Sequence, residues 1–264
     1  MSGDAGHVQD DLRRQWEENA EFFASLIGNR GTPHHRKILN PCVDRLLGEL
    51  SGKRLLDAGC GEGYLSRYFA ERGARVTGVD FSERLIRNAE KLTSDVSVDY
   101  RVGDICELSA LHEQSFDAVL CNLVILNVPC AQDAISEFYR VLDRGGILVM
   151  SIVHPAFDFY GPGEWEMGER NEDTGRREGL CFKMDNYFEE QTYERYWRSR
   201  EGERFPEPIT FFHRTISSYF DFLTTAGFEV TKLEEPVPVD KDPFFDRERR
   251  IPFFMVFKAV KSEE

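Results

Sequence analysis

The chain has 264 residues, of which 41% are hydrophobic and 30% charged, with a formal net charge of −14. This composition is typical of a globular protein with a sizeable core, and no apolar run approaches the roughly 18 residues that span a bilayer. The acidic balance argues against electrostatic binding to nucleic acid, which needs clustered Lys and Arg. The polar first residues, MSGDAGHVQDDLRRQWEEN, resemble neither a secretory signal nor a transit peptide, so we expect a cytoplasmic protein without a membrane partner.

Two helices are expected before the first strand. Val8–Ile27 has an amphipathic pattern. Asn40 and Pro41 predict an N-cap and a first-turn proline for a helix that ends near Leu50. We assign residues 1–50 to an N-terminal helical lid.

From Lys53 to Ser151, short apolar runs alternate with helical patterns, which predicts a parallel sheet covered by helices. Strands are expected at Arg54–Gly59, Ala74–Asp80, within Val96–Ile105, Phe116–Leu123 and Ile147–Val153, and helices at Tyr64–Arg72, Ser82–Lys91 and Ala131–Leu142.

Residues 154–209 break this alternation with a stretch rich in Gly, Glu, Arg and aromatic residues. A bare connection of that length is uncommon in a compact domain. We predict an inserted cap that binds substrate, with a short hairpin around Tyr187–Arg198. A helix at Thr215–Ala226 and strands at Phe228–Leu233 and Phe253–Val260 follow, so residues 51–153 and 210–264 are expected to form one domain.

The most informative stretch is LLDAGCGEG at Leu55–Gly63, followed by Asp80 at the end of the next expected strand. A glycine-rich turn lets a ligand approach the backbone, and an acidic residue about 20 positions later suits a ribose diol. Tyr64 stands where a dinucleotide fingerprint has its third glycine. Asp57 would repel a pyrophosphate but attract the ammonium of a methionine moiety. The charges therefore favour S-adenosylmethionine over NAD.

Four segments in order carry a family resemblance: LLDAGCGEGYLSRYFAERGARVTGVDFSERLI, GDI at Gly103–Ile105, FDAVLCNLVI at Phe116–Ile125 and YRVLDRGGILVMSI at Tyr139–Ile152. Together they closely resemble the motifs of class I S-adenosylmethionine-dependent methyltransferases. The resemblance implies an α/β, Rossmann-like, doubly wound sheet of seven strands with the last strand antiparallel. It also implies S-adenosylmethionine as cofactor and S-adenosylhomocysteine as product.

The resemblance further implies a set of cofactor-binding residues. These are Asp57, Gly59, Cys60 and Gly61 at the methionine end, Asp80 at the ribose hydroxyls, Phe81 near the adenine, Asp104 and Ile105 at the adenine amino group and ring, and Asn122 and Leu123 beside the methionine and the transferable methyl group.

Methyl transfer is an in-line displacement at an already activated carbon, so the enzyme mainly holds the acceptor atom in line. A general base helps only where the acceptor is protonated. His154, directly after the fifth strand, and His213, before the late helix, are the catalytic candidates. Either is alternatively a hydrogen-bonded structural histidine. His34 and His35 lie between the N-terminal helices and are candidates for contact with a lid.

The insertion offers two kinds of substrate contact. Its aromatic residues would stack on a planar acceptor or form a small core of their own. Its acidic residues would attract a cationic acceptor, although a solvated charged face is the favoured interpretation. These acidic residues are Glu164, Glu166, Glu189 and Glu190.

Other patterns argue against further classes. Asn122-Leu123-Val124-Ile125 replaces the Asn/Asp-Pro-Pro-aromatic tetrad of enzymes that methylate amino groups of nucleic acid bases. Six cysteines without a C-x-x-C pair argue against a zinc site and a disulfide scaffold and indicate buried reduced thiols. We find no convincing carboxylate-rich site for a divalent ion, so no metal is expected.

We therefore expect a methyltransferase that acts on an O or N atom of a small-molecule acceptor, such as a secondary metabolite or a quinone precursor. The alternatives are a catalytically silent regulatory subunit that binds S-adenosylmethionine or S-adenosylhomocysteine, and a protein or RNA methyltransferase. An NAD-dependent oxidoreductase is disfavoured by the glycine spacing. Monomer and homodimer both stay open.

Overall fold

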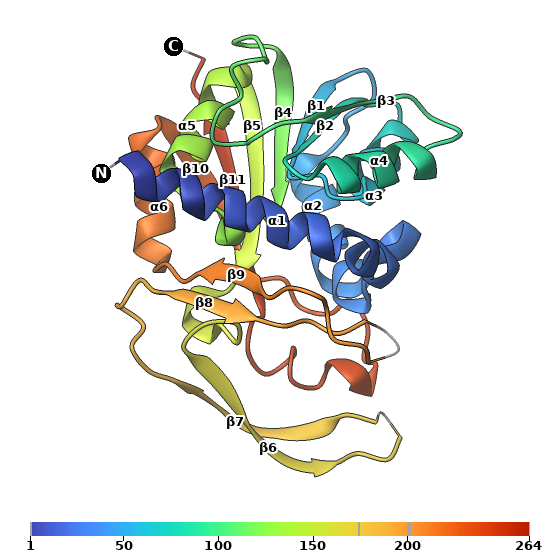
Figure 1. Ribbon diagram of the computed structural model, residues 1–264, viewed down its shortest axis with the longest axis vertical. Helices are drawn as coiled ribbons and strands as arrows, with labels where there is room; N and C mark the ends of the chain where they lie inside the picture. The colour runs from blue at the N-terminus through green and yellow to red at the C-terminus, as the bar shows by residue number, and fades with distance from the viewer. Residues whose placement is uncertain (1, 174, 200–201, 264) are drawn as a thin grey trace.

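A mixed seven-stranded sheet forms the centre of the protein. The structure is a computed structural model that describes residues 2–173, 175–199 and 202–263. The strand order is β3-β2-β1-β4-β5-β11-β10, and β11 runs antiparallel to both of its neighbours, β5 and β10 (Figure 1). The strands are β1 (Arg54–Ala58), β2 (Arg75–Asp80), β3 (Val98–Val102), β4 (Phe116–Asn122), β5 (Leu142–Val153), β10 (Phe228–Glu234) and β11 (Phe254–Lys261). The predicted fold class is confirmed.

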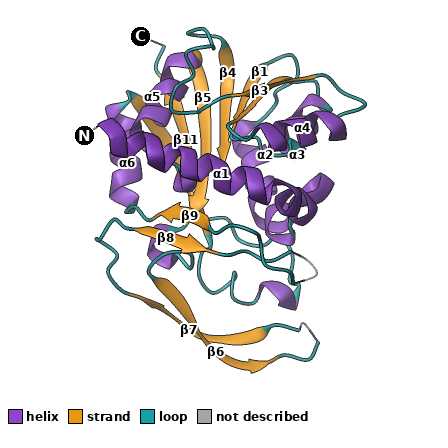
Figure 2. Cartoon of the chain, in the orientation of Figure 1, coloured by secondary structure: helices purple, strands orange, loops and turns teal. Residues whose placement is uncertain are grey.

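Helices cover both faces of this sheet (Figure 2). They are α1 (Ser2–Ile27), α2 (Asn40–Leu47), α3 (Tyr64–Ala70), α4 (Glu83–Leu92), α5 (Ala131–Val141) and α6 (Ile216–Thr225). Two of these helices begin with a side-chain N-cap: the Ser82 side chain accepts from the Leu85 N–H, and the Thr215 side chain accepts from the Ser218 N–H.

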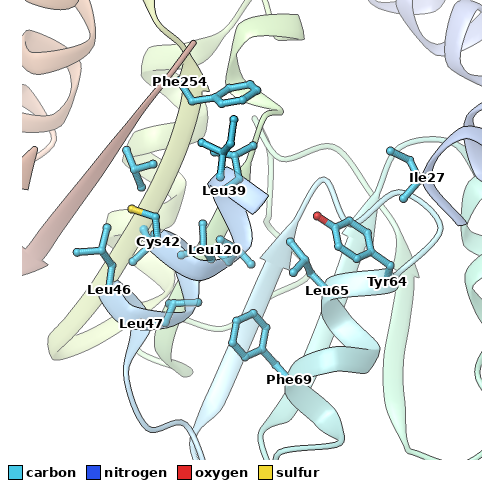
Figure 3. Close-up of a cluster of buried hydrophobic side chains, with 14 of the residues drawn as sticks. Ile27, Leu39, Cys42, Leu46, Leu47, Tyr64, Leu65, Phe69, Leu120 and Phe254 are labelled. Carbon is cyan, nitrogen blue, oxygen red and sulfur yellow. The ribbon is translucent and has the colours of Figure 1, made fainter. Parts of the chain in front are cut away.

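Successive residues of the central strands belong to two different hydrophobic cores. Leu55 and Leu120 face the core that contains α2 and α3, whereas Leu56 and Val119 face the core that contains α5 and α6. Figure 3 shows part of the first core, with Leu120 among side chains of α2 and α3. A strand that is buried on both faces reads as a continuous apolar run, which is why the sequence shows these strands so clearly.

The strand β5 is longer than predicted. It begins at Leu142, five positions before the expected Ile147, and its pairing with β4 shifts register between Phe116 and Ala118. Gly145, at a φ of +71°, lies within this irregular start rather than at the end of a helix. Gly145 and Gly146 therefore belong to β5.

The chain is helical from Pro33 into α2, after a break at Gly31 and Thr32. A π-helix, η2 (His35–Leu39), leads directly into α2, and the Asn40 N–H donates to the His35 carbonyl. The expectation that Asn40 caps the helix was wrong, because the chain is already helical before it. Figure 1 shows α1 crossing the front of the sheet near the carboxyl ends of its parallel strands.

The insertion contains two antiparallel pairs beyond the carboxyl ends of the parallel strands (Figure 1). One is the hairpin of β6 (Gly163–Arg170) and β7 (Arg177–Met184). The other joins β8 (Thr192–Arg195) to β9 (Ile209–Phe212). The predicted hairpin around Tyr187–Arg198 was wrong in its extent: β8 lies within that range but pairs with the next strand, β9, whose Ile209 and Phe211 are buried.

Two cysteines depart from the expected reduced state. Cys106, after β3, and Cys130, directly before α5, form a disulfide with Cα atoms 6.1 Å apart. Cys42, Cys60 and Cys121 are free and buried as expected, whereas Cys181 is free and exposed. The sequence did not reveal this disulfide, because the two cysteines are 24 positions apart and spacing alone does not show which cysteines meet. None of the helices in the described ranges combines the length and the apolar character needed to cross a membrane.

Candidate active site

A cavity of about 690 Å³ opens at the carboxyl ends of the parallel strands, where open α/β folds bind ligands. The structure brings all ten of the predicted cofactor-binding residues to its wall. They come from the ends of β1, β2 and β4 and from the loops that follow β1, β2, β3 and β4. The opposite wall comes from α1, the segment around η2, the insertion and the segment before β11.

The turn after β1 requires glycine at two positions. Gly59 has a φ of +77°, and a Cβ atom there would lie 2.4 Å from a methyl carbon of Val124. Gly61 has a φ of +57°, and its Cβ would lie 3.2 Å from the ring of Phe23. The backbone of this turn is therefore bare toward the cavity, as close approach of a ligand requires.

Two buried aspartates flank that turn. Asp57 Oδ2 accepts from Ser66 Oγ at 2.6 Å. Burial and the nearby Asp80 charge raise the pKa of Asp57 to about 6, although the Ser66 hydrogen bond acts to lower it. Asp80 accepts from the Gly61 and Ser82 N–H groups, both at 2.9 Å, yet burial still raises its pKa to about 6. Both carboxylates are thus poised to be stabilised by a cationic or hydroxyl-bearing ligand.

Glu62 is a cavity residue that the sequence did not single out. Its side chain is 1% exposed, its Oε1 atom has no hydrogen-bond partner among the described residues, and burial raises its pKa to about 8. It is therefore a neutral acid at pH 7. Its position between Gly61 and Gly63, inside the glycine-rich turn, was the feature of the sequence that could have marked it as a cavity residue.

The loop after β3 is in contact with the N-terminal helix α1. Asp104 accepts a hydrogen bond from the Cys106 N–H at 2.8 Å through Oδ1, and its Oδ2 accepts from the side-chain amide of Gln9. Gln9 on α1 thus donates to Asp104, the carboxylate that the resemblance assigns as acceptor for the adenine amino group. Ile105 is buried beside them.

The end of β4 is held by side-chain contacts with β5. Asn122 Oδ1 accepts from Ser151 Oγ at 2.7 Å, and the Leu123 N–H donates to the same hydroxyl at 3.0 Å. Leu123 has a φ of +57°, which is uncommon for a non-glycine residue and concentrates at functional sites.

The two predicted catalytic histidines do not line the cavity. His154 Nε2 pairs with Glu235 at 2.8 Å while Nδ1 accepts from the Ala156 N–H, and burial lowers its pKa. His213 is held by Asp158 at 3.1 Å and by the Tyr187 carbonyl at 2.9 Å. Burial would lower the pKa of His213, but these partners raise it. With both ring nitrogens engaged and no cavity surface, the structure gives both histidines structural positions.

His34 and His35 line the cavity instead. His35 Nδ1 accepts from the Thr32 N–H at 3.2 Å, and burial and the neighbouring positive charges lower its pKa to about 4. It is therefore neutral, with its proton on Nε2, and is a hydrogen-bond donor rather than a base.

His34 has a carboxylate partner. Its Nε2 lies 2.7 Å from Glu248 Oε1, and the Glu248 side chain is fully buried. Burial would raise the pKa of Glu248, but the His34 hydrogen bond and the Arg176 charge lower it. A carboxylate there fixes the tautomer and leaves His34 Nδ1 as the acceptor. Only the tertiary fold reveals this pair, because 214 positions separate the two residues.

Comparison with known proteins places this geometry in a family. Residues 56–150 match the family described as "Methyltransferase domain". An uncharacterized protein of Haemophilus influenzae is 30% identical over 237 residues, which cover 86% of this chain and 88% of that protein. An S-adenosylmethionine dependent methyltransferase from Mesorhizobium loti has a TM-score of 0.68 and 25% identity, over 88% of this chain and 100% of that one. The chain belongs to the class I S-adenosylmethionine-dependent methyltransferases. It is a methyltransferase, and its cofactor is S-adenosylmethionine.

Another relative of this methyltransferase carries a pathway and a reaction in its name. The ubiquinone biosynthesis O-methyltransferase of Hahella chejuensis is 36% identical over 151 residues, which are 55% of this chain and 59% of that protein. The chain thus spans less than two thirds of that relative.

The wall of the methyltransferase cavity that faces the insertion differs from the cofactor wall. It is mainly aromatic, and its aromatic members are Trp16, Phe23, Phe159, Tyr160, Trp165, Trp197, Phe211, Phe253 and Phe254. The predicted aromatic surface of the insertion therefore reaches the cavity. Glu164, Glu166, Glu189 and Glu190 are exposed and do not line it, in keeping with a solvated face.

Proposed function

We propose that this methyltransferase transfers the methyl group of S-adenosylmethionine to an oxygen or nitrogen atom of a small-molecule acceptor. One observation carries the proposal: the glycine-rich cofactor turn and the aromatic surface of the insertion line the same cavity. Its volume of about 690 Å³ lies within the range of about 300–1,000 Å³ that is usual for ligand pockets. The O-methyltransferase name of the Hahella relative also supports a small acceptor.

The ten predicted cofactor residues suit a cationic nucleoside. Asp57 and the neutral acid Glu62 would hold the methionine ammonium, and the bare backbone of Gly59 and Gly61, with Cys60 between them, would lie against the amino acid. Asp80 has one further lone pair on each oxygen for the ribose hydroxyls. Asp104 would accept from the adenine amino group between Phe81 and Ile105, and Asn122 and Leu123 would lie beside the methyl group.

Bound S-adenosylmethionine supplies a methyl group that its sulfonium already activates. The protein's task is then to align the acceptor atom and to keep water out. We assign alignment to the aromatic wall and closure to residues 1–50 and 154–209. His34 Nδ1 would take the proton of a hydroxyl acceptor, and Glu248 would stabilise the resulting imidazolium.

A panel of phenols, amines and carboxylic acids tests the proposal, with release of S-adenosylhomocysteine as the readout. We expect turnover with at least one acceptor and its loss in the Asp80→Ala variant. Tight cofactor binding with no turnover across the panel would favour the silent regulatory subunit.

A further inference from the structure

The charged residues around the cavity are divided between its two walls. Every acidic residue in the described lining lies on the cofactor wall: Asp57, Glu62, Asp80 and Asp104. The lining contributed by the insertion and by the segment before β11 contains Arg176, Arg198 and Arg247 and, among the described residues, no acid. This arrangement opposes the net charge of −14 of the whole chain.

Among these arginines, Arg247 has the least compensated charge. Arg176 pairs with the buried Glu248 at 3.1 Å, and Arg198 is exposed and donates to the Gly202 carbonyl at 2.8 Å. Arg247 is half-buried, and none of the described carboxylates lies within ion-pair distance of it. Among the described residues, the hydrogen-bond and ring partners of its guanidinium are the Met167 sulfur, at 3.9 Å, and the ring of Trp165, at 5.9 Å from the centroid.

Two further donors in the same lining lack acceptors. The Nε1 atoms of Trp165 and Trp197 are buried, and no acceptor in the described part of the chain pairs with either. Both indole rings line the cavity, although their Nε1 atoms have almost no accessible surface in the unliganded protein. A buried donor without an acceptor is costly and rare in native proteins. A ligand with acceptor oxygens would satisfy both donors.

We infer that the acceptor of this methyltransferase is an aromatic carboxylic acid whose carboxylate binds Arg247 and the indole N–H of Trp165. Guanidinium and indole N–H groups are the donors that a carboxylate accepts from. The surrounding aromatic residues provide flat apolar surfaces for a ring. Trp197 Nε1 would bind a second oxygen substituent of the same ring. The inference rests on the proposed function, since it names the class of acceptor for that site.

Calorimetric titration tests the inference on protein saturated with S-adenosylhomocysteine. The probes share a hydroxynaphthalene ring and differ in one group: 6-hydroxy-2-naphthoate, its amide, and the aminomethyl analogue. We expect the acid to bind about tenfold or more tightly than the amide, and the amine to bind most weakly, because charge-assisted hydrogen bonds exceed neutral ones.

Matched variants assign the effect to Arg247. Arg247→Gln should abolish the preference for the acid. Arg250→Gln should retain it, because Arg250 also lies over the Trp165 ring, at 5.4 Å, but does not line the cavity. Trp165→Phe keeps the ring and removes only the N–H group, so it should weaken binding of the acid about two- to tenfold while the melting temperature holds or rises.

The outcomes are separable. Equal binding of acid and amide, tighter binding of the amine, or binding of none of the three while S-adenosylhomocysteine binds would overturn the inference and leave the proposed function standing. Failure of S-adenosylhomocysteine itself to bind would overturn both. If Arg247→Gln does not fold, Trp165→Phe decides, and an unchanged affinity for the acid in that variant contradicts the inference.

Discussion

His34 Nε2 and Glu248 Oε1 lie 2.7 Å apart although 214 positions of the chain separate the two residues. The carboxylate is fully buried and His34 borders the cavity. The pair therefore places a buried negative charge beside a histidine that borders the cavity. A histidine base needs such a partner to hold a proton transiently.

Replacing His34 should slow methyl transfer without weakening the cofactor. With a hydroxyl acceptor, His34→Gln should lower kcat about 10²- to 10⁴-fold, and the Kd for S-adenosylmethionine should change less than about twofold. His112→Gln is the control, because His112 is exposed and lies outside the cavity lining. Glu248→Gln should also lower kcat, because the imidazolium of His34 then lacks its counter-charge. An unchanged kcat in His34→Gln would remove it from the reaction.

Asp57 should make the unliganded protein less stable at neutral pH. Its pKa is about 6 in the folded protein against an ordinary value of 3.8, so its contribution to stability is fully present below about pH 4 and is lost as the pH rises through 6. Asp57→Asn should therefore raise the free energy of unfolding at pH 7 by about 1–3 kcal/mol, as urea titration can measure. A less stable variant at pH 7 would contradict the burial argument.

The same aspartate should make cofactor binding depend on pH. The Kd for S-adenosylmethionine should rise as the pH falls below about 6, because protonation removes the carboxylate that faces the methionine ammonium. Asp80 also has a pKa of about 6 and adds to this effect. The Asp57→Asn variant should bind weakly and show a flatter pH profile, and calorimetry over pH 5–8 checks both points.

Gln9 should compete with the adenine for Asp104. Its side-chain amide donates to Asp104 Oδ2, so Gln9→Leu should tighten binding of S-adenosylhomocysteine about two- to tenfold, the usual value of one hydrogen bond. Asp10→Ala, an exposed neighbour on the same helix, should bind as the wild type does. Weaker binding in Gln9→Leu would instead make Gln9 part of the closed site.

The Cys106–Cys130 disulfide should hold the adenine loop in place. Protein prepared without reductant should show four free thiols after denaturation, from Cys42, Cys60, Cys121 and Cys181. Replacing both bridged cysteines by serine should lower the free energy of unfolding by about 2–4 kcal/mol. It should also weaken cofactor binding, since the Cys106 N–H orients Asp104. Six free thiols would show that the bridge does not form.

The sequence predicted the sheet well because its strands are buried on both faces and stand out as apolar runs. It predicted the glycine turn because Gly59 and Gly61 need positive φ angles that other residues rarely adopt. Local patterns also predicted the helices that begin near Ser82 and Thr215.

The remaining errors concern contacts between distant parts of the chain. The pairing of β8 with β9, the Cys106–Cys130 bridge and the His34–Glu248 pair depend on tertiary contacts that no local pattern encodes. His154 was a reasonable catalytic candidate at the end of a strand, but its ring lies outside the cavity lining and meets Glu235. A position at the end of a strand does not determine whether the side chain points into the cavity or away from it.

The most direct test of the central claim is a calorimetric titration of one preparation with S-adenosylmethionine, S-adenosylhomocysteine and NAD, repeated on Asp80→Ala. We expect micromolar binding of the first two ligands, no signal with NAD, and loss of binding in the variant, because Asp80 would hold the ribose hydroxyls. Near-native affinity in Asp80→Ala, or no binding of either nucleoside to the wild type, would contradict the assignment of this cavity as the cofactor site.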